Sequence, residues 1–100
     1  LIAVPTLEIM AAQMAPYNMA NAWLCPMLDA RRMEVYCQLF DGSLLAKSRV
    51  EAKVVEAGSF EMELNQHPVM FFGNGAAKCR EVIAHAAATF IEGVHPSADK

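Results

Sequence analysis

The stretch that most constrains the fold spans residues 24–41. Two apolar segments within it are joined by a short polar connection at residues 29–33. The second segment alternates, with Val35, Cys37 and Leu39 on one side and the intervening residues on the other. Alternation with a period of two is typical of a strand that buries one face. The stretch therefore predicts a strand, a tight turn and a second strand.

Three charged residues surround this predicted turn. Asp29 and Arg31 lie where the first strand ends, and Glu34 opens the second strand. We expect their side chains to gather at one end of the hairpin, which makes that end a candidate binding site. The alternative is that they only satisfy the backbone groups of the turn and one another at the surface. Spacing alone leaves both interpretations open.

Composition limits the classes of protein that the chain can belong to. Its 100 residues suffice for one domain spanning residues 1–100, and its 55% hydrophobic content is slightly above that of ordinary globular proteins. The excess favours a surface that a partner or a second domain covers. The net charge is −3 and the basic residues are scattered, which argues against a nucleic-acid-binding face.

The cysteines indicate a reducing compartment. Cys25, Cys37 and Cys79 are odd in number, widely spaced and embedded in apolar sequence, so we expect buried free thiols in a cytoplasmic protein. No apolar run approaches the roughly 20 residues of a membrane span, and no secretory signal is visible. The sequence opens on Leu1 within an apolar run, and we expect it to be a piece of a longer protein.

The segment before the hairpin reads as a strand followed by a helix. Residues 1–4 are apolar and are followed by Pro5, which predicts a short buried strand. Thr6 is then a candidate N-cap, and Pro16 should end the helix. The predicted apolar face of this helix has residues three or four apart: Leu7, Met10, Ala11 and Met14.

After the hairpin, a third strand is expected at residues 50–55, which would complete an antiparallel meander. Its predicted inner side carries Val50, Ala52 and Val54, with the charged positions in solvent. Ser59 is expected to cap a short helix that packs Phe60 and Leu64 into the core.

The last third of the chain predicts a parallel βαβ unit. Residues 69–72 form an unbroken apolar run, glycines follow, and an amphipathic helical pattern extends to residue 86. A further strand is expected at residues 89–92, with a helix start at residues 95–98. Together, the predicted strands and helices indicate an α/β fold with a mixed sheet and flanking helices.

Gly73, Asn74 and Gly75 follow the predicted buried strand directly. In α/β folds this position receives ligands, because glycine lets the backbone approach a phosphate or ribose closely. The segment has neither the dinucleotide-binding fingerprint nor the ending of a P-loop. A tight turn that needs positive φ explains both glycines equally well.

No self-contained catalytic or metal site is predicted. The histidines, His67, His85 and His95, lack metal-ligand spacing, and no serine has the context of a nucleophile elbow.

The order of these segments resembles the second half of the TsaB family, also called YeaZ. Residues 27–36 read MLDARRMEVY, residues 71–79 read FFGNGAAKC, and the residues at 1–14 and 95–98 also fit. This family is the bacterial paralogue of TsaD and is often labelled a glycoprotease. The resemblance implies an actin-like ATPase (ribonuclease H-like) fold. It also implies that this chain is the carboxy-terminal lobe, without the amino-terminal lobe.

The resemblance further implies a function. TsaB proteins are non-catalytic scaffolds or activators in the synthesis of threonylcarbamoyladenosine in transfer RNA, with TsaD and TsaE as partners and only indirect contact with the RNA. It implies no metal, no catalytic residue and no cofactor in this piece, with ATP or ADP held by the full complex. Gly73, Asn74 and Gly75 would then line a remnant of the nucleotide cleft.

Three other functions remain open from the sequence. One is a nucleotide-dependent transferase or hydrolase whose cleft the missing lobe completes. A second is a peptidase, which needs a metal or nucleophile that this sequence does not show. A third is a structural module whose exposed apolar surface makes the chain self-associate.

Overall fold

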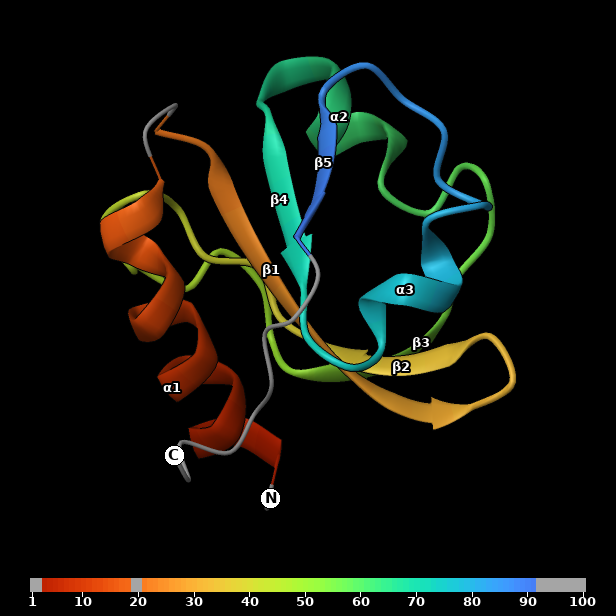
Figure 1. The fold of residues 1–100 in the computed structure, drawn as a ribbon, viewed down its shortest axis with the longest axis horizontal. Helices are drawn as coiled ribbons and strands as arrows, with labels where there is room; N and C mark the ends of the chain where they lie inside the picture. Colours follow the sequence, from red (N-terminus) through yellow and green to blue (C-terminus); the bar gives the residue numbers. More distant parts are fainter. Residues whose placement is uncertain (1–2, 19–20, 92–100) are drawn as a thin grey trace.

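The structure is a computed structural model that describes residues 3–18 and 21–91. Its centre is one five-stranded sheet in the order β3-β2-β1-β4-β5 (Figure 1). The strands are β1 (Trp23–Arg31), β2 (Glu34–Cys37), β3 (Glu51–Val54), β4 (Val69–Phe72) and β5 (Ala88–Ile91). Pairs β1–β2 and β2–β3 are antiparallel, whereas β1–β4 and β4–β5 are parallel. The α/β fold with a mixed sheet and flanking helices is therefore confirmed.

Helices lie on both faces of this sheet. They are α1 (Ala3–Met14), which continues into the 3-10 helix η1 (Ala15–Tyr17), then α2 (Glu61–Gln66) and α3 (Ala76–Cys79). In Figure 1, α1 lies to the left of the sheet, and α2 and α3 lie on the right-hand side. Each face has its own apolar core, and β4 contributes to both, with Val69 and Phe71 in one and Met70 and Phe72 in the other. This two-sided burial confirms the prediction from its unbroken apolar run.

The prediction of a strand at residues 1–4 is wrong for residues 3 and 4, which the structure describes, because helix α1 begins at Ala3. Thr6 consequently lies inside the helix and does not cap it. The first turn of a helix tolerates Pro5, since its N–H would have no partner there in any case. The rest of the prediction is confirmed: the face carrying Leu7, Met10, Ala11 and Met14 is buried, and α1 ends before Pro16.

The third strand is present, but it faces the opposite way from the prediction. Its register pairs Lys53 with the fully buried Val35, so Lys53 lies on the core side of the sheet. Lys53 Nζ lies 4.6 Å from the ring centroid of Phe60, where a cation is favourable. Val54 is 60% exposed, whereas Val55 is buried. The register of the hairpin thus overrides the pattern within the strand.

The short helices also differ in detail from the prediction. Ser59 Oγ accepts a hydrogen bond from the Glu56 N–H at 2.7 Å, and the helix N-cap is Phe60, without a side-chain cap. Phe60 and Leu64 are buried as predicted. Helix α3 has only four residues, so the predicted extension to residue 86 is wrong. The helix start predicted at residues 95–98 lies outside the described residues.

The connection from β2 to β3 is braced by the Asp41 side chain. Asp41 Oδ1 accepts hydrogen bonds from the N–H groups of Ser43 (2.8 Å) and Leu45 (3.0 Å). The hydrogen bond from Leu45, followed by that from Ser43, lowers the pKa of Asp41 below its ordinary value of 3.8. The charged carboxylate is therefore the form that holds this loop.

Replacing Asp41 by alanine is expected to destabilise the protein at neutral pH. Because the folded-state pKa is depressed, the contribution of Asp41 is present above pH 3.8 and is lost as the pH falls through the folded value. Thermal unfolding of the native protein and of Asp41→Ala, followed from neutral to acidic pH, measures the contribution of Asp41 to stability. The difference in melting temperature should shrink below pH 3.8, and a constant difference would contradict the role of the charge.

Candidate functional site

The candidate site is the turn that joins β4 to α3, where it meets β1. Gly73 has φ +104°, in the region that side chains avoid. A Cβ at Gly73 would overlap the Met27 carbonyl oxygen and lie 2.5 Å from Met10 Cε. Gly75 has an ordinary φ of −94°, but a Cβ there would lie 2.9 Å from the Asp29 nitrogen. Positive φ therefore accounts for the need for glycine only at position 73. At position 75 the need for glycine comes from the close approach of the backbone to β1.

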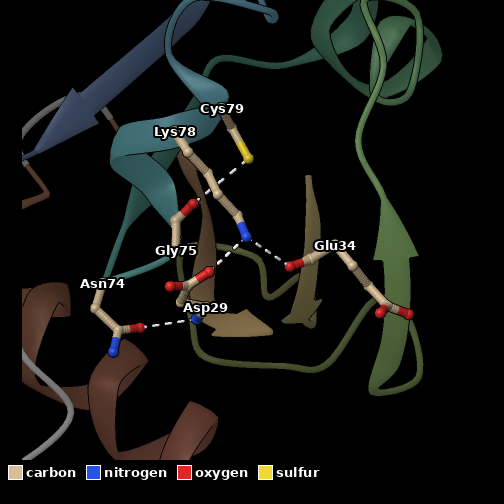
Figure 2. Close-up of polar contacts among 6 residues, drawn as sticks. All are labelled: Asp29, Glu34, Asn74, Gly75, Lys78 and Cys79. Carbon is tan, nitrogen blue, oxygen red and sulfur yellow. Dashed lines mark hydrogen bonds and ion pairs between the residues drawn. The ribbon is translucent and has the colours of Figure 1, made fainter. Parts of the chain in front are cut away.

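Backbone and side-chain hydrogen bonds fasten this turn to β1, and Figure 2 shows the one between Asn74 and the Asp29 N–H. The Gly75 N–H donates to the Met27 carbonyl at 3.1 Å, and the Asp29 N–H donates to Asn74 Oδ1 at 2.9 Å. The Ala76 N–H donates to the Gly73 carbonyl at 3.1 Å. The N–H groups of Gly75 and Ala76 are thus already used within the protein. A phosphate at this turn would have to break these bonds or use other donors.

Lys78 joins three parts of the fold. Its Nζ forms an ion pair with the Asp29 carboxylate and donates a hydrogen bond to the Glu34 carbonyl at 2.9 Å (Figure 2). The ammonium on α3 is therefore held between the end of β1 and the start of β2. Bonds from a charged donor are stronger than neutral ones. We call Asp29, Asn74, Gly75 and Lys78 the hairpin clamp.

The structure brings together only some of the residues predicted for a site. Asp29, Asn74 and Gly75 are in direct contact. Glu34 contributes its backbone carbonyl, and Figure 2 shows its carboxylate turned away from Lys78. The functional roles assigned to these residues and to Arg31 remain predictions. Lys78 was missed because nothing in the sequence links it to Asp29, 49 residues earlier.

Replacing Lys78 by methionine is expected to cost about 1–2 kcal/mol of unfolding free energy. The change removes a charge-assisted hydrogen bond to the Glu34 carbonyl as well as the ion pair. The ion pair alone contributes little, because the Asp29 side chain is 53% exposed.

Urea unfolding measures the loss, with Lys47→Met as the control. Lys47 makes a looser, partly exposed pair with Asp41 at 3.8 Å, so its replacement should cost less than about 0.5 kcal/mol. Equal losses in the two variants would mean that Lys78 does not clamp the hairpin.

The three cysteines are buried and free, as predicted. Burial raises the pKa of Cys25, and burial likewise raises the pKa of Cys79 to about 11. The hydrogen bond with Cys25 lowers the pKa of Cys37. Cys79 Sγ lies 3.5 Å from the Gly75 carbonyl oxygen, as a weak donor to the clamp turn. Buried thiols such as Cys25 and Cys79 remain protonated and are poor nucleophiles at neutral pH.

Residues 3–18 and 21–91 hold no group of three or more His, Cys, Asp or Glu side chains arranged to bind a metal ion. This part of the chain also has no helix with the length and apolar character needed to cross a membrane.

Comparison with known proteins gives a structural relative. No protein-family model matches this chain, and no curated protein sequence matches it. The chain is similar to a crystal structure of an uncharacterized protein with similarity to peptidase YeaZ from Pseudomonas aeruginosa. The TM-score is 0.61 at 16% identity, over 87% of this chain and 42% of the other, so this chain spans about two fifths of that protein. The similarity establishes a shared fold: this chain folds like part of a YeaZ-like protein.

Proposed function

We propose that the protein containing this chain is a non-catalytic scaffold or activator of the complex that makes threonylcarbamoyladenosine in transfer RNA. A TsaD-like protein would be its main partner, and a TsaE-like protein a second one. The chain would act in the cytoplasm and contact the RNA only indirectly. The support is a YeaZ-like fold together with a sequence that resembles the carboxy-terminal lobe of TsaB.

The observation that carries this proposal is the hairpin clamp. The sequence resemblance rests mainly on residues 27–36 and 71–79, which are far apart in the chain. The structure joins these two segments through the Asn74, Gly75 and Lys78 contacts with β1 and β2. Sequence segments that resemble one family and also form one contact network are better explained by a shared structural unit than by chance. The clamp residues bond to backbone and to each other, which suits a structural joint.

A nucleotide would be held by the complex and not by this chain alone. At the glycine turn, the N–H groups of Gly75 and Ala76 are engaged with Met27 and Gly73. Gly73, Asn74 and Gly75 would contribute at most the wall of a cleft that other parts of the assembly complete.

Deletion of the gene tests the proposed function directly. Mass spectrometry of nucleosides from bulk transfer RNA should show loss of threonylcarbamoyladenosine in the deletion strain. Reintroducing the gene should restore it, and reintroducing a copy with a stop codon within this region should not. Unchanged modification in the deletion strain would exclude the proposed role.

A further inference from the structure

The hairpin clamp contains the one Asn–Gly pair of this chain, Asn74–Gly75. In an open chain this is the pair most prone to deamidation, in which the nitrogen of the second residue attacks the side-chain Cγ of the asparagine. Glycine makes the attack easy, because it has no side chain to shield its nitrogen and few limits on its backbone angles. Asn74 is exposed, so water reaches its side chain. Without protection, this asparagine would therefore be lost quickly.

The structure restrains both of the groups that would react. The Gly75 N–H donates to the Met27 carbonyl at 3.1 Å and Gly75 is buried, so a base in solvent does not reach the proton that must leave first. Asn74 Oδ1 accepts a hydrogen bond from the Asp29 N–H at 2.9 Å, which fixes the orientation of the side-chain amide (Figure 2). Drawing Cγ onto the Gly75 nitrogen would give up both hydrogen bonds. Deamidation therefore requires the turn to separate from β1.

We propose that Asn74 is a site of spontaneous deamidation that the hairpin clamp protects. While the clamp is closed, the asparagine persists, and conversion takes place only in molecules whose turn has opened. Because the chemistry is slow compared with opening and closing of a turn, its rate follows the equilibrium population of the open form. This inference is independent of the proposed function.

The reaction of the open turn consumes only water. The Gly75 nitrogen gives up its proton and forms a bond to Cγ of Asn74, and the Cγ–Nδ2 bond breaks with release of ammonia. The product is a cyclic imide. Water then adds to one of the two imide carbonyl carbons and opens the ring. Addition at one carbon gives aspartate, and addition at the other gives isoaspartate, in which the main chain runs through the side chain.

The two products differ in whether the clamp can close again. Aspartate at position 74 keeps an oxygen that accepts the Asp29 N–H. Isoaspartate lengthens the main chain by one atom directly before Gly75. The turn has no room for an added atom there, since even a Cβ on Gly75 would lie 2.9 Å from the Asp29 nitrogen and from the Leu28 carbonyl carbon. Formation of isoaspartate would therefore leave the clamp open permanently.

Timed incubation of the protein that contains this chain, at mildly alkaline pH, followed by peptide mapping with mass spectrometry, measures the conversion of Asn74. Conversion in urea should be at least about tenfold faster than in the folded protein. Lys78→Met should raise the rate in the folded protein by about 5–30-fold, because it removes the ammonium that holds α3 to β1 and β2. Lys47→Met, which removes a lysine outside the clamp, should leave the rate unchanged.

The readout is the mass change of the peptide that contains residue 74, and Asn74→Gln should show no change even in urea, because glutamine forms the corresponding ring far more slowly. The proposal is overturned if Asn74 converts equally fast in the folded protein and in urea, or if it does not convert in urea. It is also overturned if Lys78→Met and Lys47→Met convert at the same rate. The isoaspartate form, separated by anion exchange, should show rapid amide exchange at Asp29, and a protected amide there would refute permanent opening.

Discussion

Gly73→Ala is expected to lower the free energy of unfolding by about 3 kcal/mol or more. The alanine would have to adopt φ +104°, and its Cβ would overlap the carbonyl oxygen of Met27 on the neighbouring strand. Backbone strain costs about 1–3 kcal/mol and overpacking a further 1–3 kcal/mol, because β1 and β4 cannot move apart without breaking the sheet. For a domain of this size, the melting temperature should fall by about 12 °C or more.

Thermal and urea unfolding measure this effect against Gly58→Ala. Gly58 has no positive φ, and a Cβ there would meet only Glu61 Oε1 at 3.6 Å. The control should change stability by less than about 1 kcal/mol. Similar losses in both variants would show that the turn after β4 is not as tightly packed as described.

Gly75→Val is also expected to lower the free energy of unfolding by about 3 kcal/mol. Gly75 has an ordinary φ, so here the cost comes from space alone. A Cβ would lie 2.9 Å from both the Asp29 nitrogen and the Leu28 carbonyl carbon, and 3.0 Å from Val35 Cγ1. Two of these atoms are backbone and cannot turn aside, so α3 must move away from β1. The movement would also separate Lys78 from Asp29.

Ala77→Val is the control, because it also introduces valine, but at an exposed position of α3, the helix that Gly75 caps. Its expected cost is a helix-propensity difference below about 0.7 kcal/mol. Amide exchange at Asp29, whose N–H donates to Asn74, should accelerate in Gly75→Val and stay slow in Ala77→Val. An Asp29 amide that remains protected in Gly75→Val would refute the close packing of the turn on β1.

The sequence predicted the elements whose patterns are local. The alternation at Val35, Cys37 and Leu39 identified the hairpin, and the unbroken run at residues 69–72 identified the buried parallel strand. Both depend on which faces of a single strand are buried, and that information is present in a few adjacent residues.

The features that the sequence did not reveal depend on partners far along the chain. Lys53 faces the core because its register with Val35 is set by the hairpin, and it is tolerated there by its position over Phe60. The apolar residues at the start of α1 read as a strand because short apolar runs do not distinguish strand from helix. Lys78 and Asp29 meet across 49 residues without any local signal. Contacts of this kind follow from the assembled sheet and not from periodicity.

We propose that this chain belongs to a scaffold and does not form a nucleotide site by itself. Isothermal titration of ATP and ADP into the protein that contains this chain, alone and then with the proposed TsaD-like partner, tests this proposal most directly. We expect no saturable heat from the protein alone and saturable binding once the partner is present. Saturable binding to the protein alone, lost in Asn74→Ala, would mean that the turn after β4 is a working nucleotide site, and the scaffold proposal would be wrong.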